Sequence, residues 1–399
     1  MATIFRNGKV IVGNGEVIEK GAVAIDGNII AFVGETKKIK PSKKDRIFDI
    51  SGKTILPGLI DAHVHLCIDG SPDPMTSLLK DSIPQLTLKA AHHARQTLGA
   101  GVTTVRDMGG RDYVDLAIRD GIESGLLQGP RMICSGRVLC MTGGHGWQFG
   151  READGADEIR EAVREQLKMG VDFIKMIATG GVMTKGVEPG ATQFTLEELS
   201  AGVEEARKAG RRTATHAQGT EGIKNSLRAG VNSIEHGFFL DDEAIELMLE
   251  MKAYLVPTLN APYQIIRGGV KKGVPRFAVE KSKAVMKSHF QSVQRAYKAK
   301  IPIAMGTDAG TPFNCHGENL KEMELLVKAG MTPMEAIIAT TNIASEVLGL
   351  EKKIGTVEKG KLADLIVMDG DPLKDIRVLQ DKDKILAIMK DGDLYKCQL

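Results

Sequence analysis

The segment Leu59–Leu66, LIDAHVHL, places two histidines two residues apart in a short apolar run. Alternate residues of a β-strand face the same side, so His63 and His65 share one face of this strand. The turn at Pro57 and Gly58 and the apolar flanks favour a buried strand. A buried neutral imidazole needs a hydrogen-bonding partner or a metal ion. The segment therefore predicts a metal-binding strand, although an isolated pair of this kind also occurs on solvated strand faces.

Seven more short apolar runs follow this segment and alternate with helical patterns that end in glycine, a common helix stop. This alternation is typical of parallel strands joined by helical crossovers. The eight predicted strands are Leu59–Leu66, Val102–Met108, Arg131–Gly136, Val171–Ala178, Arg212–Ala217, Ser233–Gly237, Tyr254–Leu259 and Ile301–Asp308. Eight β/α cycles over roughly 250 residues are the count of a TIM barrel, so we expect an α/β chain with a (β/α)8 barrel.

Both ends of the chain differ from this middle part. Short β-branched runs separated by NG, GNG and DGN turns lead up to the first barrel strand, and ADLIVMDGDP and KILAIMKDGDLY lie near the other end. These patterns indicate antiparallel sheet. We expect residues 1–57 and 355–399 to form one small, discontinuous β-sandwich domain, and residues 58–354 to form the barrel.

The composition limits the function classes. The 399 residues are 42% hydrophobic and 26% charged, which is enough apolar material for a sizeable core. The formal charge of +2 and the scattered Lys and Arg residues do not indicate a nucleic-acid partner. Five scattered cysteines without CxxC spacing argue against a disulfide framework. We expect a soluble, cytoplasmic protein with a small-molecule substrate and no membrane partner, and the sequence permits a homo-oligomer.

Further metal-ligating side chains lie at strand ends. His216, His236 and Asp308 fall at the C-terminal ends of the fifth, sixth and eighth predicted strands. TIM barrels place their active sites at that face, and imidazole and carboxylate groups are the usual ligands of zinc and similar ions. Together with the first-strand pair, these residues predict a metal centre.

Lys175 lies within an apolar stretch of the fourth predicted strand, where a lysine is costly unless it is paired or neutral. One interpretation is an ion pair with a carboxylate in the barrel. The other is a lowered pKa that lets the neutral amine react with carbon dioxide. The resulting carbamate could bridge two cations about 3.5–4 Å apart.

These residues belong to motifs of a known family. LPGLIDAHVHL, GVTTVRDMGG, TGGHG, DFIKMIATGGV, SIEHG, GTDAG and GTVEKGKLADLIVMDGDP run in order over nearly the whole chain. The sequence resembles the amidohydrolase superfamily, in its imidazolonepropionase-like and Xaa-Pro dipeptidase (prolidase)-like branch. The motifs are specific for the superfamily and less so for the substrate.

The resemblance implies a role for each metal ligand. By position, His63, His65 and Asp308 resemble the ligands of the more buried metal ion. His216 and His236 resemble the ligands of a second ion. Lys175 resembles the carboxylated lysine that bridges the two ions in this branch. Zinc is the ion that these ligand types favour, although manganese, cobalt or iron would fit the same ligands. Carbon dioxide would be present as the Lys175 carbamate.

Two further positions concern the substrate. His145, in the loop after the third predicted strand, resembles a histidine that contacts the substrate in such enzymes. Related dipeptidases often carry a tyrosine after the His-Gly of the sixth strand, where it helps to bind substrate. Here that position is Phe238, which lacks a hydroxyl group, so a standard dipeptide specificity is in doubt.

The implied activity is a binuclear hydrolase that attacks an amide C–N bond with metal-bound hydroxide, with Asp308 moving the proton and His145 assisting. The expected substrate is a dipeptide (Xaa-Pro-like) or an N-acyl amino acid with a free carboxylate. The first alternative is a hydrolase that opens a cyclic amide, imide or lactone. The remote alternative is a non-catalytic barrel that serves as a binding protein.

The segment after the seventh strand suggests how a carboxylate would be held. It contains many basic residues against Glu280 alone, namely Arg267, Lys271, Lys272, Arg276 and Lys281. Its glycines would allow movement, so we expect a positive lid with Arg267 and Arg276 contacting the substrate. The alternative is a solvated helix start that points away from the cleft.

Overall fold

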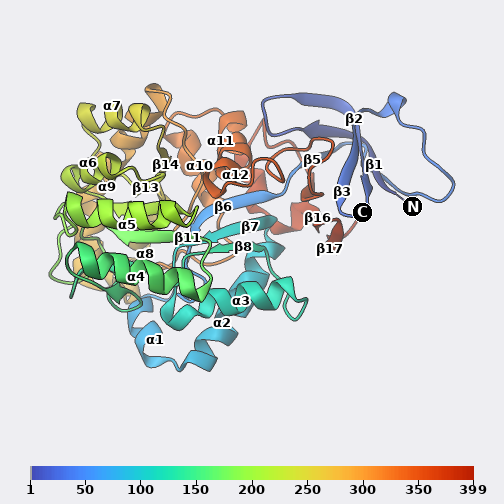
Figure 1. The fold of residues 1–399 in the computed structure, drawn as a ribbon. Helices are drawn as coiled ribbons and strands as arrows, with labels where there is room; N and C mark the ends of the chain where they lie inside the picture. Colours follow the sequence, from blue (N-terminus) through green and yellow to red (C-terminus); the bar gives the residue numbers. More distant parts are fainter. Residues whose placement is uncertain (1) are drawn as a thin grey trace.

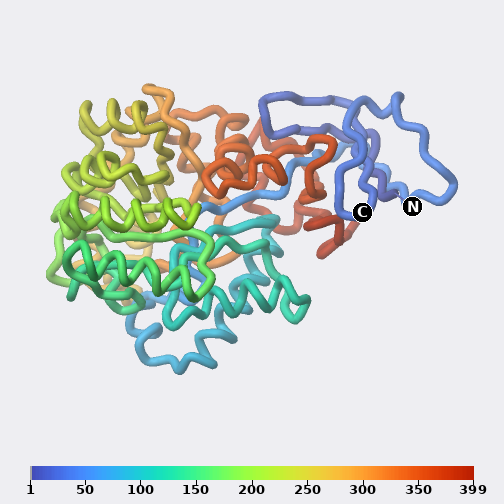
Figure 2. The backbone as a smooth tube through the Cα atoms, viewed as in Figure 1, coloured from blue at the N-terminus to red at the C-terminus, as the bar shows by residue number. Residues whose placement is uncertain are grey.

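The computed structural model describes residues 2–399, so residue 1 of the predicted terminal domain lies outside the described residues. The first and last segments of the chain lie together at one end of the molecule (Figures 1 and 2). They form one eight-stranded sheet in the order β17-β16-β15-β5-β1-β2-β3, with β4 beside β1. Its strands are β1 (Thr3–Ile11), β2 (Val17–Asp26), β3 (Ile29–Glu35), β4 (Arg46–Asp49), β5 (Lys53–Pro57), β15 (Leu365–Asp369), β16 (Ile385–Lys390) and β17 (Asp393–Cys397).

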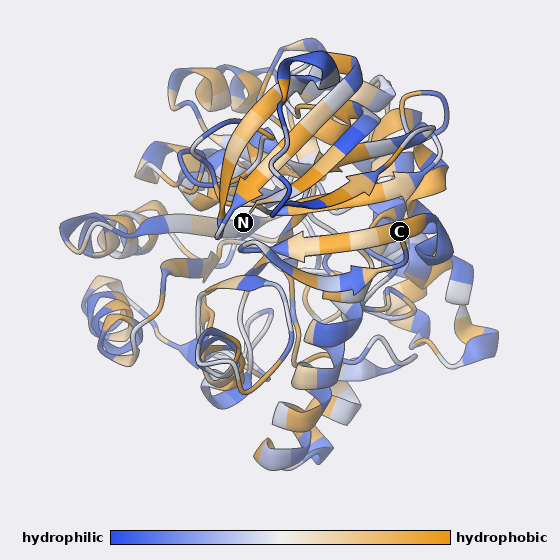
Figure 3. Ribbon diagram, turned by 90° about the vertical axis from the view of Figure 1, so that its right-hand side faces the viewer, coloured by the Kyte–Doolittle hydropathy of each residue, from blue (hydrophilic) through white to orange (hydrophobic). Residues whose placement is uncertain are grey.

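Strand β5 joins the two halves of this sheet, because it pairs with β1 on one side and with β15 on the other. Alternate residues of both halves point into one apolar core, for example Phe5 and Val23 from the first half and Leu365 and Val367 from the second. Figure 3 faces this sheet and shows the apolar stretches along its strands. The two chain ends thus form one continuously hydrogen-bonded sheet with a shared core.

The middle of the chain forms two parallel sheets. One has the order β6-β7-β8 and the other has the order β10-β9-β11-β12-β13-β14. Their strands are β6 (Leu59–Val64), β7 (Val102–Asp107), β8 (Arg131–Cys134), β9 (Leu139–Cys140), β10 (Arg151–Glu152), β11 (Phe173–Ile177), β12 (Arg212–Ala217), β13 (Ser233–His236) and β14 (Tyr254–Val256). Seven of the eight predicted barrel strands therefore exist, most of them shorter than predicted.

The eighth predicted strand, 301–308, is not a regular strand. It is hydrogen-bonded to β14 through Leu255 N–H and the carbonyl of Pro302 (3.0 Å), and to β6 through Ala62 N–H and the carbonyl of Met305 (2.9 Å). The segment ends at Asp308, which has a positive φ of 59°. Since this segment bonds to both sheets, it joins them along one edge. Asp172 N–H donates to the carbonyl of Cys134 (2.8 Å) at the other junction, an arrangement consistent with a barrel.

Helices lie outside the parallel strands and bury one apolar face each (Figure 1). Their ends follow local signals: Thr195 and Glu198 form a capping box at the start of α5, and Gly170 ends α4 with a φ of 87°. The helices are α1 (Pro74–Lys80), α2 (Ile83–Gly99), α3 (Val114–Glu123), α4 (Ala156–Met169), α5 (Leu196–Lys208), α6 (Thr220–Ala229), α7 (Asp242–Glu250), α8 (Asn260–Gly268), α9 (Arg276–Lys298), α10 (Lys321–Lys328), α11 (Pro333–Thr340) and α12 (Asn342–Leu348). Within residues 2–399, none of them combines the length and apolar character needed to span a membrane.

Candidate metal centre

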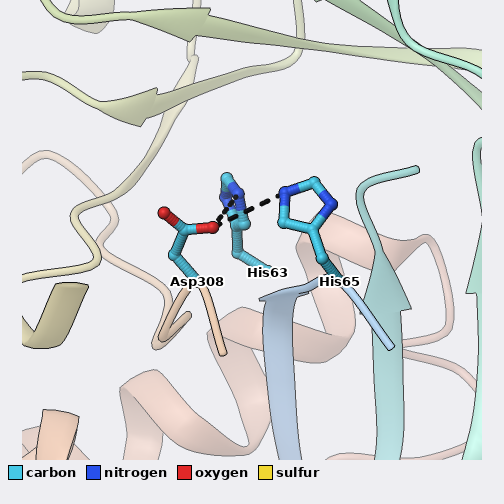
Figure 4. Close-up of side chains that lie close together, drawn as sticks. All are labelled: His63, His65 and Asp308. Atoms are coloured by element: carbon cyan, nitrogen blue, oxygen red, sulfur yellow. Dashed lines mark ion pairs between the residues drawn. The ribbon is translucent and has the colours of Figure 1, made fainter. Parts of the chain in front are cut away.

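Three predicted ligands meet at the C-terminal end of β6. The Nε2 atoms of His63 and His65 each lie 3.5 Å from Oδ1 of Asp308 (Figure 4). One ligand atom from each residue lies within 4.8 Å of the other two. The strand alternation brings the two imidazoles to one face, and the turn at Asp308 directs its carboxylate towards them. Two imidazoles and a carboxylate at this spacing form a metal site.

The other predicted ligands line the same cavity. Lys175 comes from β11, His216 from β12 and His236 from β13. The imidazole rings follow one another around the cavity, with centroids 5.0 Å apart for His63 and His236 and 4.4 Å apart for His236 and His216. His145 continues this series, 4.3 Å from His216. All six predicted ligands and His145 are therefore brought together.

Hydrogen bonds to Nδ1 orient several of these imidazoles. His63 Nδ1 is 2.8 Å from Glu235 Oε2, His65 Nδ1 is 2.8 Å from the carbonyl of Gly109, and His236 Nδ1 is 2.7 Å from Thr258 Oγ1. With Nδ1 engaged in this way, Nε2 stays free to bind a metal ion.

Glu235 is a functional residue that the sequence interpretation missed. It is fully buried, and its Oε1 accepts hydrogen bonds from Arg106 Nη2 (2.8 Å) and Ser233 Oγ (2.6 Å) while Oε2 contacts His63. Arg106 is itself held by the carbonyl of Ala62 (2.7 Å). This network neutralises a buried carboxylate and fixes the orientation of a metal ligand. The signal was present in SIEHG, where Ser233 and Glu235 share one face of a predicted strand.

The surroundings favour neutral imidazoles. Burial holds the pKa of His63, His216 and His236 well below the ordinary value and lowers the pKa of His65 to about 4. Unprotonated imidazole is the form that binds metal ions, so no proton has to be displaced near neutral pH.

Lys175 and Asp308 supply the observation that tests the fit of a metal ion. Among the described residues, no acceptor lies within hydrogen-bond distance of the buried Lys175 Nζ. Burial lowers the pKa of Lys175 to about 8 and raises the pKa of Asp308 to about 8. A nearby cation would favour the neutral form of the Lys175 amine and the ionised form of the Asp308 carboxylate, so these residues fit a metal centre.

The rest of the cavity wall is largely apolar. Phe149 packs edge-on against His65, with ring centroids 5.4 Å apart, and continues the wall away from the ligands. The apolar lining consists of Ile68, Met75, Val138, Phe149, Ile177, Val182 and Met183. Side-chain hydrogen-bonding groups come from Gln148, Thr184, Gln218 and Thr311. Such a wall suits a substrate with a sizeable apolar group.

Three predicted substrate contacts lie elsewhere. Phe238 is buried outside the cavity lining and packs on His289, with ring centroids 4.2 Å apart. Arg267 is exposed on α8 and lines a separate cavity beside α10. Arg276 is exposed at the start of α9, near Glu280 of the same helix. None of these three residues is among the described residues that line the ligand cavity, so their contacts with a substrate stay predictions.

Most of the chain matches a known family. The model described as Amidohydrolase family matches residues 54–395, and the chain belongs to this family. The family and the His63, His65 and Asp308 site define a metal-dependent hydrolase rather than a non-catalytic barrel. The predicted resemblance is thereby confirmed.

Three similar proteins show how close the resemblance is. A crystal structure of a Xaa-Pro dipeptidase with bound methionine in the active site is 36% identical, with a TM-score of 0.92, covering 99% of this chain and 100% of that one. Ochratoxinase from Aspergillus niger is 32% identical over 424 residues, covering 99% of this chain and 86% of that protein. Imidazolonepropionase from Bacillus thuringiensis is 24% identical over 392 residues, covering 88% and 84%.

Proposed function

We propose that this protein hydrolyses a peptide-like amide C–N bond and that its centre holds two divalent metal ions. The convergence of six ligating side chains from five strand positions on one cavity carries the proposal. His63, His65 and Asp308 would hold one ion, and His216 and His236 the other. When bound, such ions lower the pKa of a water molecule and polarise the substrate carbonyl. Zinc suits these ligands.

Lys175 would bridge the two ions after carboxylation. Its neutral Nζ amine adds to carbon dioxide and releases one proton, which gives a carbamate with two oxygen atoms. The pKa, lowered to about 8, increases the fraction of neutral amine near neutral pH. The lack of a hydrogen-bond acceptor within the described residues leaves that amine free to react.

Asp308 and His145 would act on the substrate. The Asp308 carboxylate accepts a proton during attack on the carbonyl and transfers it to the leaving nitrogen, which departs poorly as an anion. His145 is partly buried, and desolvation lowers its pKa to about 3, so its imidazole is neutral. His145 Nδ1 lies 2.8 Å from Thr184 Oγ1. In the tautomer that we propose, the Thr184 hydroxyl donates to Nδ1, and Nε2 carries the proton and donates to the developing oxyanion.

The substrate we infer is a dipeptide or an N-acyl amino acid whose apolar side chain lies along the Phe149 wall. Relatives named as a Xaa-Pro dipeptidase and an ochratoxinase support this class. Opening of a neutral cyclic amide, imide or lactone is the second candidate. It is favoured by the cavity itself, because Lys175 is the only lysine and no arginine is present among the described lining residues.

The remaining features of the proposal follow from the fold and composition. We infer that the parallel strands complete a (β/α)8 barrel over residues 58–354 and that residues 1–57 and 355–399 form a sandwich-like domain. A small-molecule substrate suits the narrow, ligand-lined cavity. We propose a cytoplasmic location, without a nucleic-acid or membrane partner.

Matched substrates test this function. Metal-reconstituted protein is assayed with N-acyl amino acids that have apolar side chains, each paired with its terminal carboxamide, and with cyclic imides and lactones. We expect cleavage of the amide bond, with the carboxylate member of each pair preferred. Equal cleavage of both members removes the carboxylate requirement, and turnover of cyclic substrates alone selects the second candidate.

A further inference from the structure

The loop between β11 and α5, residues 178–195, forms part of the cavity wall and also holds His145. Val182, Met183 and Thr184 of this loop line the cavity. Besides the contact between Thr184 Oγ1 and His145 Nδ1, the backbone N–H of His145 donates to Gln193 Oε1 (3.0 Å). The position of the His145 ring therefore depends on the position of this loop.

The loop backbone packs directly against the His145 ring. A β-carbon added at Gly181 would lie only 2.6 Å from His145 Cε1, so a glycine is required for this approach. Because the contact leaves no free space, a shift of the loop must displace the imidazole or open a gap beside it.

Lys281 of α9 forms hydrogen bonds with the backbone of the same loop. Its Nζ donates to the carbonyl of Thr184 (2.8 Å) and to the carbonyl of Val187. Within the described chain, Lys281 makes no ion pair with a carboxylate, so two carbonyl groups of one loop are its polar partners. Nearby Lys283 and Lys287 are instead exposed on the outer face of α9.

We propose that Lys281 is a positioning residue that straps this loop to α9 and thereby sets the Thr184–His145 contact and the apolar wall at Val182 and Met183. The inference rests on the proposed function, because His145 is the substrate-contacting group. A charged donor to two carbonyls is stronger than a neutral one, and it acts on the loop at the residue that contacts the imidazole. Lys281 does not reach the cavity itself.

Limited proteolysis tests the strap without any substrate. Lys185 and Gly186 are exposed in the loop, so trypsin can cut between them when the loop opens. In the full-length, metal-loaded protein, Lys281→Met should speed this cleavage at least several-fold, as followed by mass spectrometry. Lys281→Arg should restore most of the protection, because a guanidinium can reach the same carbonyls. Lys287→Met is the matched control and should leave the cleavage rate unchanged.

Kinetics test the consequence for His145. With the best substrate, Lys281→Met should lower kcat/KM by roughly ten- to a hundredfold, the scale expected for a misplaced active-site group, with the metal content unchanged. Thr184→Val, which removes the hydroxyl but not the strap, should lower kcat/KM without changing the cleavage rate. The double variant should lose less than the sum of the two single losses in free energy, because Lys281 acts through Thr184.

The rival explanation is that Lys281 merely stabilises the fold. That explanation predicts a lower melting temperature and faster cleavage along the whole chain, and such a result overturns the proposal. Cleavage at Lys185 and kcat/KM values equal to those of Lys287→Met overturn it as well. If no amide is hydrolysed but Lys281→Met still opens the loop selectively, the proposed function fails while the strap is retained.

Discussion

Lys175 combines two properties that are rarely found together in one lysine. It is buried among imidazole ligands, and no acceptor within the described residues satisfies its amine. A permanently charged ammonium at this point would repel both the neighbouring Arg106 and incoming cations. A carboxylated side chain would reverse that charge and explain why a lysine occupies the position.

Replacement of Lys175 tests this role. Lys175→Ala should lose most of its activity and bind metal more weakly, because the bridging oxygens are removed. A short-chain carboxylic acid should restore part of the activity, and apo-protein should regain activity faster when bicarbonate is present. Metal content and turnover are measured beside Lys168→Ala, an exposed lysine on α4. Unchanged metal content and activity in Lys175→Ala would refute the bridge.

Asp308 is the residue proposed to move the proton. Asp308→Asn keeps the size of the side chain and one oxygen for the metal, but it cannot accept a proton. The turnover number should fall by at least about a hundredfold, the usual scale for loss of a general base, while much of the metal is retained. Near-normal turnover with full metal content would assign the base to another group.

At the level of elements, the loop after β6 is fixed by two histidines from different parts of the chain. His93 of α2 contacts the carbonyl of Leu66 through Nδ1 (2.8 Å), and His316 contacts the carbonyl of Ile68 through Nε2 (2.9 Å). The two rings stack, with centroids 4.5 Å apart. Both imidazoles must remain neutral to keep this packing, because a protonated imidazole would be unfavourable in the buried stack.

This arrangement predicts an acid sensitivity. Burial lowers the pKa of His316 to about 3, whereas a histidine in the unfolded chain has a pKa of about 6.5. The unfolded chain therefore binds more protons, and stability falls as the pH falls from about 6.5. In His316→Gln, the unfolding free energy from urea titrations should change less between neutral and acidic pH. His92→Gln, an exposed control on α2, should follow the unmodified protein, and an unaltered slope in His316→Gln would contradict the account.

The sequence predicts the strand ends well because the strand period places His63 and His65, and strand order places His216 and His236. It could not predict where Arg267 and Arg276 point, since that depends on how α8 and α9 pack. The irregular backbone at Asp308 could not be predicted either, because Asp308 is hydrogen-bonded to β6, which is far away in the sequence. Glu235 was detectable, but its partner Arg106 becomes evident only when β7 and β13 are placed in space.

At the scale of the whole molecule, the terminal sheet is joined to the parallel strands by polar contacts. Gly58 N–H donates to the carbonyl of Asp364 (2.7 Å), and Arg131 of β8 forms ion pairs with Asp364 and Asp391. The cavity lies among strand ends remote from this junction. The terminal sheet packs against the strands but contributes none of the described cavity-lining residues. The metal centre is thus assembled entirely by residues between β6 and the segment that ends at Asp308.

Metal stoichiometry is the measurement that tests the central claim most directly. Protein is produced in metal-supplemented medium, freed of loosely bound ions, and assayed for metal by elemental analysis and for amide hydrolysis in the same preparation. The account predicts two divalent ions per chain at full activity, because the proposal assigns five of the six cavity side chains to two sites and places Lys175 between them. A reproducible value of one ion per chain at full activity would contradict it.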